Sequence, residues 1–179
     1  MNRAHRAIVT DVNEPAITVR DATAADLPAV AAIYTHYVLN TTITFNIQVR
    51  TPREWTERFS AIAEGRYDLL VADRDGDVLG YVETSLFRPK KAYEQSLELS
   101  VYVAPDAVGA GVGHRLYETL LARLERDERF HRAYAVIALP NDTSVTFHER
   151  AGFVHRGTLR EAGYKFGRYL DVAFYERAL

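Results

Sequence analysis

A strand that runs into a glycine-rich loop and then into a helix constrains this sequence most. Apolar residues alternate strictly through Leu97, Leu99, Val101 and Val103, which predicts a β-strand with one apolar face. Glycines follow at positions 109, 111 and 113, directly before a helical stripe of leucines. Such a loop leaves backbone N–H groups unhindered at the positive end of a helix dipole, where phosphates bind. The alternative is a glycine-rich turn that lets a strand pack closely on a helix.

The loop matches neither of two common nucleotide-binding motifs. A P-loop ends in Gly-Lys followed by Ser or Thr, whereas here Gly113 is followed by His114 and Arg115. A dinucleotide-binding fingerprint that starts at Gly109 would need glycine at position 114. Any anion bound here is therefore expected to rest on backbone amides.

Composition narrows the class of protein. With 179 residues, 47% of them hydrophobic, one compact domain is expected. A net charge of −2 argues against nucleic-acid binding through bulk positive charge. The longest apolar run, residues 133–139, is too short to cross a membrane. We therefore expect a cytoplasmic protein with neither a nucleic-acid nor a membrane partner.

The same composition restricts the chemistry. The chain has no cysteine, which excludes a covalent intermediate on a protein thiol. Its six histidines show no metal-ligand spacing, and His148-Glu149 lacks the second histidine of a zinc-protease helix. We expect no metal site.

Turn and capping signals divide the rest of the chain. Residues 1–15 lack periodicity and are expected to be a mobile extension or a loosely attached strand, which leaves residues 16–179 as a single domain. Thr51-Pro52 predicts a helix start, and Asp75-Gly76 predicts a hairpin. The expected strands cover residues 17–20, 68–72, 78–87, 97–103, 133–139, 154–159 and 169–175, and the expected helices include residues 27–39 and 144–150.

This order of elements resembles the GNAT acetyltransferase superfamily over residues 17–179. The loop from Val108 to Gly113 occupies the place of the family's acetyl-CoA loop, with Val108 where the family carries Gln or Arg. The stretch from Asn141 to Phe153 matches the family's closing motif. Several further sequence motifs resemble those of the phosphinothricin acetyltransferase branch. They are Glu98-x-Ser100-Val101-Tyr102-Val103, Leu139-Pro140-Asn141-Asp142, His148-Glu149 and Gly163-Tyr164-Lys165.

The resemblance implies a fold and an activity. The fold is α/β (α+β), a mixed, mostly antiparallel twisted sheet of about six or seven strands flanked by about four helices. The activity is transfer of acetyl from acetyl-CoA directly to the amino group of a small amino acid or analogue, such as phosphinothricin or methionine sulfoximine. A homodimer is carried over from the family alone. The alternatives are another amine acceptor (a protein N-terminus, a polyamine or an antibiotic) and a non-catalytic acyl-CoA-binding module.

Two residues are candidates for catalysis. Glu98 points away from the apolar row of its strand, beside the loop, and is our candidate general base for the protonated amine. An ion-paired strand carboxylate is its alternative. His148 stands where many relatives carry a tyrosine that protonates the departing thiolate. It can protonate the thiolate, hydrogen-bond Glu98, contact the substrate, or simply pack on a helix face.

The remaining assignments concern binding. Asn141 resembles the family's cofactor-binding asparagine, and its position in the sequence fits a helix N-cap equally well. Arg88, Lys91 and Tyr93 form a basic and aromatic segment suited to an acceptor's carboxylate or phosphinate, although a solvated loop also explains it. A second cluster, residues 164–168, closes the pocket or faces a partner subunit. The cofactor contacts that the resemblance implies are Val101, Tyr102, Val103, Gly109, Ala110, Gly111, Val112, Gly113, His114, Asn141 and Ser144.

Overall fold

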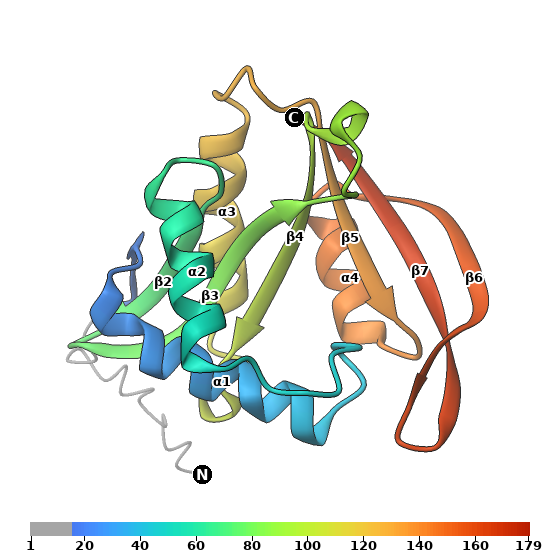
Figure 1. The fold of residues 1–179 in the computed structure, drawn as a ribbon, viewed down its shortest axis with the longest axis horizontal. Helices are drawn as coiled ribbons and strands as arrows, with labels where there is room; N and C mark the ends of the chain where they lie inside the picture. Colours follow the sequence, from blue (N-terminus) through green and yellow to red (C-terminus); the bar gives the residue numbers. More distant parts are fainter. Residues whose placement is uncertain (1–15) are drawn as a thin grey trace, which may run out of the picture.

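Residues 16–179, which the computed structural model describes, form a seven-stranded sheet between two pairs of α-helices (Figure 1). The extension predicted for residues 1–15 lies outside the described residues. The strands are β1 (Thr18–Asp21), β2 (Leu69–Arg74), β3 (Asp77–Leu86), β4 (Ser96–Val103), β5 (Arg132–Ala138), β6 (Val154–Lys165) and β7 (Arg168–Ala178). The α-helices are α1 (Leu27–Asn40), α2 (Pro52–Ala63), α3 (Val112–Leu124) and α4 (Asp142–Arg150), with 3-10 turns η1 (Ala24–Asp26), η2 (Lys91–Tyr93) and η3 (Pro105–Ala107).

The sheet has the order β1-β2-β3-β4-β5-β7-β6 and is antiparallel except at one place. Strands β4 and β5 run parallel and share only three residue pairs, the last of which joins Glu98 to Tyr134. Beyond Glu98 the two strands diverge, so the sheet opens in its middle. The predicted mixed, mostly antiparallel sheet is confirmed.

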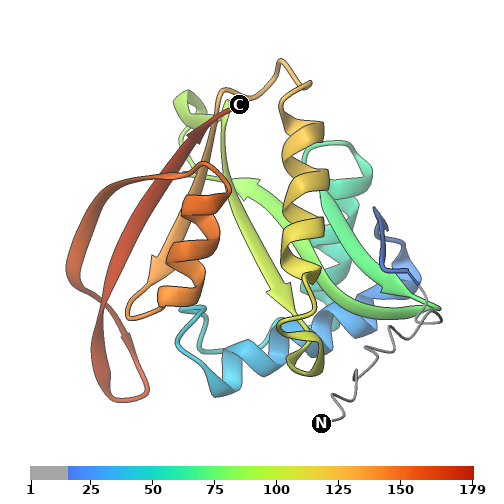
Figure 2. The same ribbon diagram turned by 180° about the vertical axis from the view of Figure 1, so that it is seen from behind.

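The two helix pairs lie on opposite faces of the sheet. Helices α1 and α2 lie in front of the sheet in Figure 1, and Figure 2 shows α3 and α4 on the other face. Under α1 and α2 the core is aromatic, and Tyr34, Trp55 and Tyr102 are buried in it. Under α3 the core is mainly aliphatic, because five of the six buried residues of that helix are valine or leucine, among them Leu116 and Leu120. Each fully buried leucine contributes roughly 1.5–3 kcal/mol of burial free energy.

Local signals in the sequence produce these elements as expected. The Thr51 side chain accepts a hydrogen bond from the Glu54 amide while the Glu54 carboxylate accepts one from the Thr51 amide, which is a capping box at the start of α2. Gly76 has φ 91°, as the tight turn between β2 and β3 requires.

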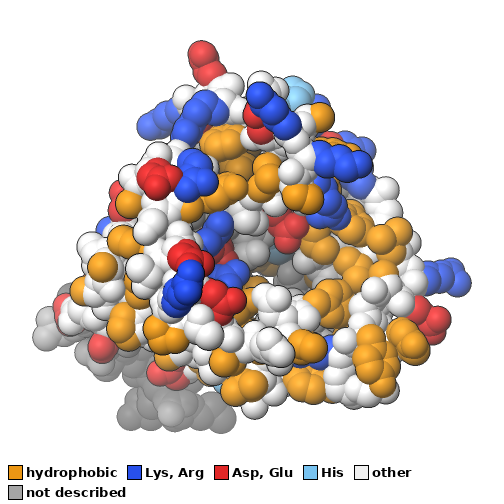
Figure 3. All heavy atoms as spheres, viewed as in Figure 1, with side chains coloured by type: hydrophobic (Ala, Val, Ile, Leu, Met, Phe, Trp, Pro, Cys, Tyr) orange, Lys and Arg blue, Asp and Glu red, His pale blue; other side chains and the backbone are white. Residues whose placement is uncertain are grey.

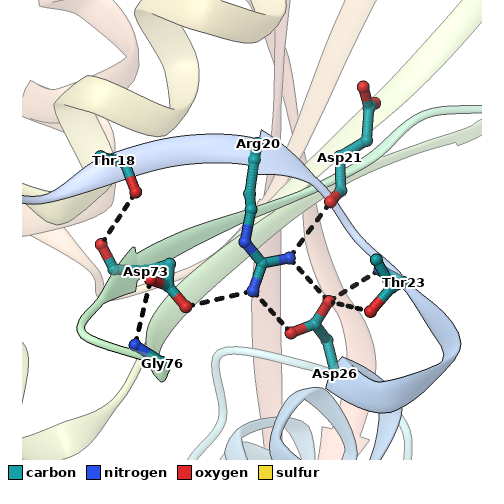
Figure 4. Close-up of polar contacts among 7 residues, drawn as sticks. All are labelled: Thr18, Arg20, Asp21, Thr23, Asp26, Asp73 and Gly76. Carbon is teal, nitrogen blue, oxygen red and sulfur yellow. Dashed lines mark hydrogen bonds and ion pairs between the residues drawn. The ribbon is translucent and has the colours of Figure 1, made fainter.

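One ion cluster fixes the first strand to the rest of the sheet. The Arg20 guanidinium donates to both oxygens of Asp26 at 2.8 Å and to Asp73 at 3.1 Å (Figure 4). The Asp26 carboxylate also accepts from the Thr23 amide and hydroxyl, and the Gly76 amide donates to Asp73. Arg20, Asp26 and Asp73 are called the edge cluster below. Hydrogen bonds from Arg20 hold the pKa of Asp26 well below its usual range, and they outweigh the opposing effect of burial.

The hairpin of β6 and β7 is longer than the sequence predicts. Residues 160–165 belong to β6, although they show no apolar alternation, because most of this strand is exposed on both faces. Its pairing with β7 carries two register shifts, next to His155 and between Leu159 and Gly163. A strand without a buried face has no period-two pattern to detect.

The hairpin holds the loop that joins α1 to α2. The buried Lys165 ammonium donates to the Thr44 carbonyl at 2.8 Å. The Phe45 ring lies directly over Gly163, where an added Cβ would be only 2.3 Å from a ring carbon. The loop can therefore sit against the hairpin only because position 163 has no side chain.

No helix among residues 16–179 is long and apolar enough to cross a membrane.

Candidate active site

A polar cavity of about 480 Å³ opens on the face that carries α1 and α2. Figure 3 shows this face hollowed near its centre, with acidic and basic side chains meeting in the hollow. Strand β4 provides Glu98, Ser100 and Tyr102, since these alternate residues share one face of the strand. Residues from α1, α2, β3 and the loop between α1 and α2 complete its walls.

Glu98 lies in this cavity with its side chain 29% exposed. Burial raises the pKa of its carboxyl, the positive charge of Arg88 opposes that rise, and the negative charge of Glu83 adds to it. The Arg88 guanidinium is 3.8 Å from the nearer Glu98 oxygen, too far for a hydrogen bond. Glu98 is thus a carboxylate with a raised pKa and open lone pairs, as a general base requires.

A second carboxylate lies deeper in the same cavity, between two arginines. Glu83 is 4% exposed, and its two oxygens accept from Arg50 at 3.3 Å and from Arg58 at 3.0 Å. Arg58 also donates to the Thr84 carbonyl. Arg50, Arg58 and Glu83 are called the cavity cluster below.

The divergence of β4 from β5 leaves a length of backbone open. From Leu99 to Val103, the edge of β4 that faces β5 has no strand partner among the described residues. The predicted contacts Val101, Tyr102 and Val103 lie in this stretch, where the Tyr37 hydroxyl donates to the Val103 carbonyl at 2.7 Å. An extended amide-containing chain can pair with such an edge.

The glycine loop has the conformation its sequence predicts. Gly109 and Gly111 have φ of 91° and 78°, and added Cβ atoms would meet only open space, so the backbone rather than crowding requires glycine. Gly111 is the N-cap of α3. The backbone N–H groups of Gly111, Val112, Gly113 and His114 have no acceptor within residues 16–179. Exposed amides at a helix start form an anion site, and Ala110 lies beside them.

Helix α4 carries the other predicted contacts. The Asn141 side chain accepts a hydrogen bond from the Ser144 amide at 3.2 Å, so it caps the helix. Its role toward a cofactor stays a prediction. The Ser144 carbonyl accepts a hydrogen bond from Nδ1 of His148 at 2.8 Å.

His148 is buried on the face opposite to the Glu98 cavity. Because its Nδ1 donates to a carbonyl, its Nε2 accepts a hydrogen bond from the Tyr117 hydroxyl, at 2.8 Å. Burial lowers the pKa of His148 to about 4, which outweighs the effect of the Ser144 carbonyl. The imidazole is therefore neutral at pH 7, packed among Tyr117, Phe147 and Phe153.

The predicted substrate residues are only partly brought together. Arg88 approaches Glu98, and its guanidinium lies 4.1 Å from the centre of the Phe87 ring. Lys91 and Tyr93 lie exposed in η2 and do not line the cavity.

Sequence reasoning missed the cavity cluster and Tyr34. Glu83 lies 33 residues from Arg50 and 25 from Arg58, so it meets them only in the fold. One signal was available, because Glu83 is a lone charge within the apolar run of residues 78–87. Within the described residues, no group of three or more histidine, aspartate or glutamate side chains could hold a metal ion.

Comparison with known proteins finds relatives that are similar to this chain over most of its length. Residues 19–174 match the model of the acetyltransferase (GNAT) domain. The chain is 46% identical to a phosphinothricin N-acetyltransferase of Streptomyces coelicolor, over 91% of this chain and 96% of that protein. It is 40% identical to an L-methionine sulfoximine/L-methionine sulfone acetyltransferase of Pseudomonas paraeruginosa, over 88% of this chain and 91% of that protein. A phosphinothricin acetyltransferase of Sinorhizobium meliloti, solved in complex with acetyl-CoA, superimposes with a TM-score of 0.86 at 38% identity, over 91% of this chain and 88% of that chain.

The fold and the open cavity beside β4 thus define an acetyltransferase. The chain belongs to the GNAT acetyltransferase family. Membership makes it an acetyl-CoA-dependent N-acetyltransferase.

Proposed function

We propose that this enzyme transfers acetyl from acetyl-CoA directly to the amino group of a small amino acid or analogue of the phosphinothricin or methionine sulfoximine type. The observation that carries this proposal is the position of Glu98 at the point where β4 leaves β5. Its carboxylate faces a polar cavity, and the next residues of the same strand have a free backbone edge. The substrate names of the relatives support the choice of acceptor.

The chain's residues divide the chemistry among them. Glu98 removes one proton from the acceptor's ammonium group, directly or through a water molecule, because an amine attacks only when neutral. The amine nitrogen bonds to the thioester carbon and the carbon–sulfur bond breaks. The nitrogen then loses a second proton to become the amide nitrogen, and this proton balances the one that the departing thiolate takes up. The backbone amides of Val101 and Val103, which lie on the open edge of β4, face the developing oxyanion. The free amides from Gly111 to His114 bind the pyrophosphate of the cofactor, with Gly109 and Ala110 beside them.

In this proposal His148 acts indirectly, by positioning the Tyr117 side chain. Its Nε2 has no proton to give at neutral pH, because it accepts the Tyr117 hydroxyl. We therefore assign it to positioning Tyr117 at the junction of α3 and α4. His148→Ala should lower kcat without moving the acid limb of the pH profile, whereas a moved limb would indicate that His148 itself titrates.

We further propose a homodimer in the cytoplasm. Large apolar side chains are exposed on the β6–β7 hairpin, among them Leu159, Tyr164 and Tyr169 at 54%, 59% and 66%. Sedimentation at micromolar concentration should give the mass of two chains, and a monomer would contradict this part.

The activity is tested by release of free thiol from acetyl-CoA across a panel of amines. We expect turnover with phosphinothricin and methionine sulfoximine, and none with peptides or polyamines. Turnover on peptides alone would replace the acceptor class. Absence of turnover on every amine, with tight acetyl-CoA binding, would indicate a binding module instead.

Glu98→Gln tests the proposed base. We expect kcat/KM at pH 7 to fall roughly 100- to 10,000-fold while acetyl-CoA affinity stays the same. Glu94→Gln, which removes an exposed carboxylate just before β4, is the matched control. Equal rates for Glu98→Gln and the wild type would remove Glu98 as the base.

A further inference from the structure

Arg50 lies in the cavity with most of its hydrogen-bonding capacity unused. Its guanidinium carbon is 4.6 Å from the centre of the Tyr34 ring and 4.7 Å from that of Trp55. Only one of its five N–H groups has an acceptor among the described residues, and this is the long 3.3 Å bond to Glu83. The side chain is 27% exposed and lines the cavity.

Apart from Glu98, the other charged groups that line this cavity already have partners within the protein. Arg58 bonds Glu83 and the Thr84 carbonyl, so Glu83 keeps a partner without Arg50. At the rim, Glu54 accepts from Thr51 and Glu57 accepts from Arg53. Each of these carboxylates already accepts a hydrogen bond from a protein group. An anionic ligand would find free donors on Arg50.

The register of the sheet relates Glu83, the partner of Arg50, to the proposed base Glu98. Ser85 pairs with Glu98 and Glu83 pairs with Ser100, so Glu83 is the diagonal neighbour of Glu98 on one face. Diagonal neighbours lie about 7–8 Å apart. Because Arg50 bonds Glu83, it approaches the same face of the sheet as Glu98, on the side of this diagonal neighbour.

We propose that Arg50 determines acceptor specificity by binding oxygen atoms at the far end of the acceptor's side chain. The amino group lies at Glu98, and the planar guanidinium, which packs against two aromatic rings, meets a phosphinate, sulfonyl or carboxylate oxygen pair. This inference rests on the proposed function, because it needs an amino acid as the acceptor. It makes lysine, whose side chain ends in a cation, a poor acceptor.

Acceptor discrimination in Arg50→Gln tests this role. We compare kcat/KM for phosphinothricin, methionine sulfone, norleucine and lysine, which end in an anion, a neutral oxygen pair, a methyl group and a cation. Loss of a charged hydrogen bond should lower kcat/KM for phosphinothricin roughly 10- to 100-fold, mainly through KM. The value for norleucine should change less than about threefold. Arg50→Lys keeps the charge and loses the planar fork, so its kcat/KM for phosphinothricin should lie between those of the wild type and Arg50→Gln.

The control for this experiment is Arg66→Gln, which removes an exposed arginine paired with Glu64. An equal loss on phosphinothricin and norleucine, or a wild-type preference for lysine, would overturn the proposal. Calorimetric binding of the same amino acids to the enzyme with coenzyme A separates the two hypotheses. Failure of all turnover would defeat the proposed function, whereas loss of phosphinothricin binding in Arg50→Gln alone would still support the role of Arg50.

Discussion

The edge cluster and the cavity cluster both consist of arginine and carboxylate side chains, but they differ in how fully the arginine is hydrogen-bonded within the protein. In the edge cluster, both oxygens of Asp26 and both oxygens of Asp73 accept hydrogen bonds from within the protein. In the cavity cluster, Glu83 is similarly buried and both of its oxygens also accept hydrogen bonds, but Arg50 contributes only one long bond. The difference lies in the arginine rather than in the carboxylate.

This comparison separates a structural ion cluster from a binding one. Burial and ion pairing alone do not indicate function, because buried pairs occur in both. The informative quantity is the number of arginine N–H groups that have no acceptor within the described part of the protein. By that measure, Arg20 in the edge cluster is largely used within the protein, whereas Arg50 in the cavity cluster can still bind a ligand.

The largest expected effect on stability comes from Asp26→Asn. This change leaves Arg20 without its main partner and should lower the free energy of unfolding at pH 7 by about 2 kcal/mol, a value reduced from that of a fully buried pair because Arg20 is partly exposed. Chemical denaturation measures the loss. The kcat/KM of the folded variant should equal that of the wild type, and a change in acceptor preference would contradict the structural assignment.

The pH dependence of that loss has a definite sign. The folded-state pKa of Asp26 lies below the unfolded value of about 3.9, so its ionised form stabilises the protein above that pH. As the pH falls from about 4 towards the folded pKa, this contribution disappears. The stability curves of the wild type and Asp26→Asn should therefore converge below about pH 4, and a constant gap would sink the explanation.

A smaller effect, opposite in direction for two variants, should appear in the acid limb of kcat/KM. The negative charge of Glu83 raises the pKa of Glu98, so Glu83→Gln should shift the limb to lower pH. The positive charge of Arg88 lowers that pKa, so Arg88→Gln should shift it to higher pH. Shifts of the same sign, or none, would show that another group controls the limb.

Much of the fold could be predicted because it depends on local signals. Alternation through Leu97 to Val103, the glycines before α3 and the Asp75-Gly76 turn each act within a few residues. The length of the β6–β7 hairpin could not be predicted, since its strands have no buried face to impose a pattern. The resemblance to a family contributed the mixed, mostly antiparallel arrangement of the sheet, which local signals leave open.

The candidate site divides in the same way. Glu98 and the loop amides could be predicted because strand alternation and the glycine spacing determine their directions. Arg50 and Glu83 could not, because they belong to a loop and a strand 33 residues apart that meet only in the folded cavity. The burial of His148 also depends on neighbours from α3 that no local pattern identifies.

The contacts of Phe45 with Gly163 and of Thr44 with Lys165 attach one cavity wall to a hairpin on the surface. Thr44 and Asn46 line the cavity, and the residue between them lies on the hairpin. A substitution in the hairpin therefore moves this wall without altering any group that touches the acceptor. Acceptor preference can thus diverge during evolution through a segment outside the active site, while Glu98 and the glycine loop stay the same.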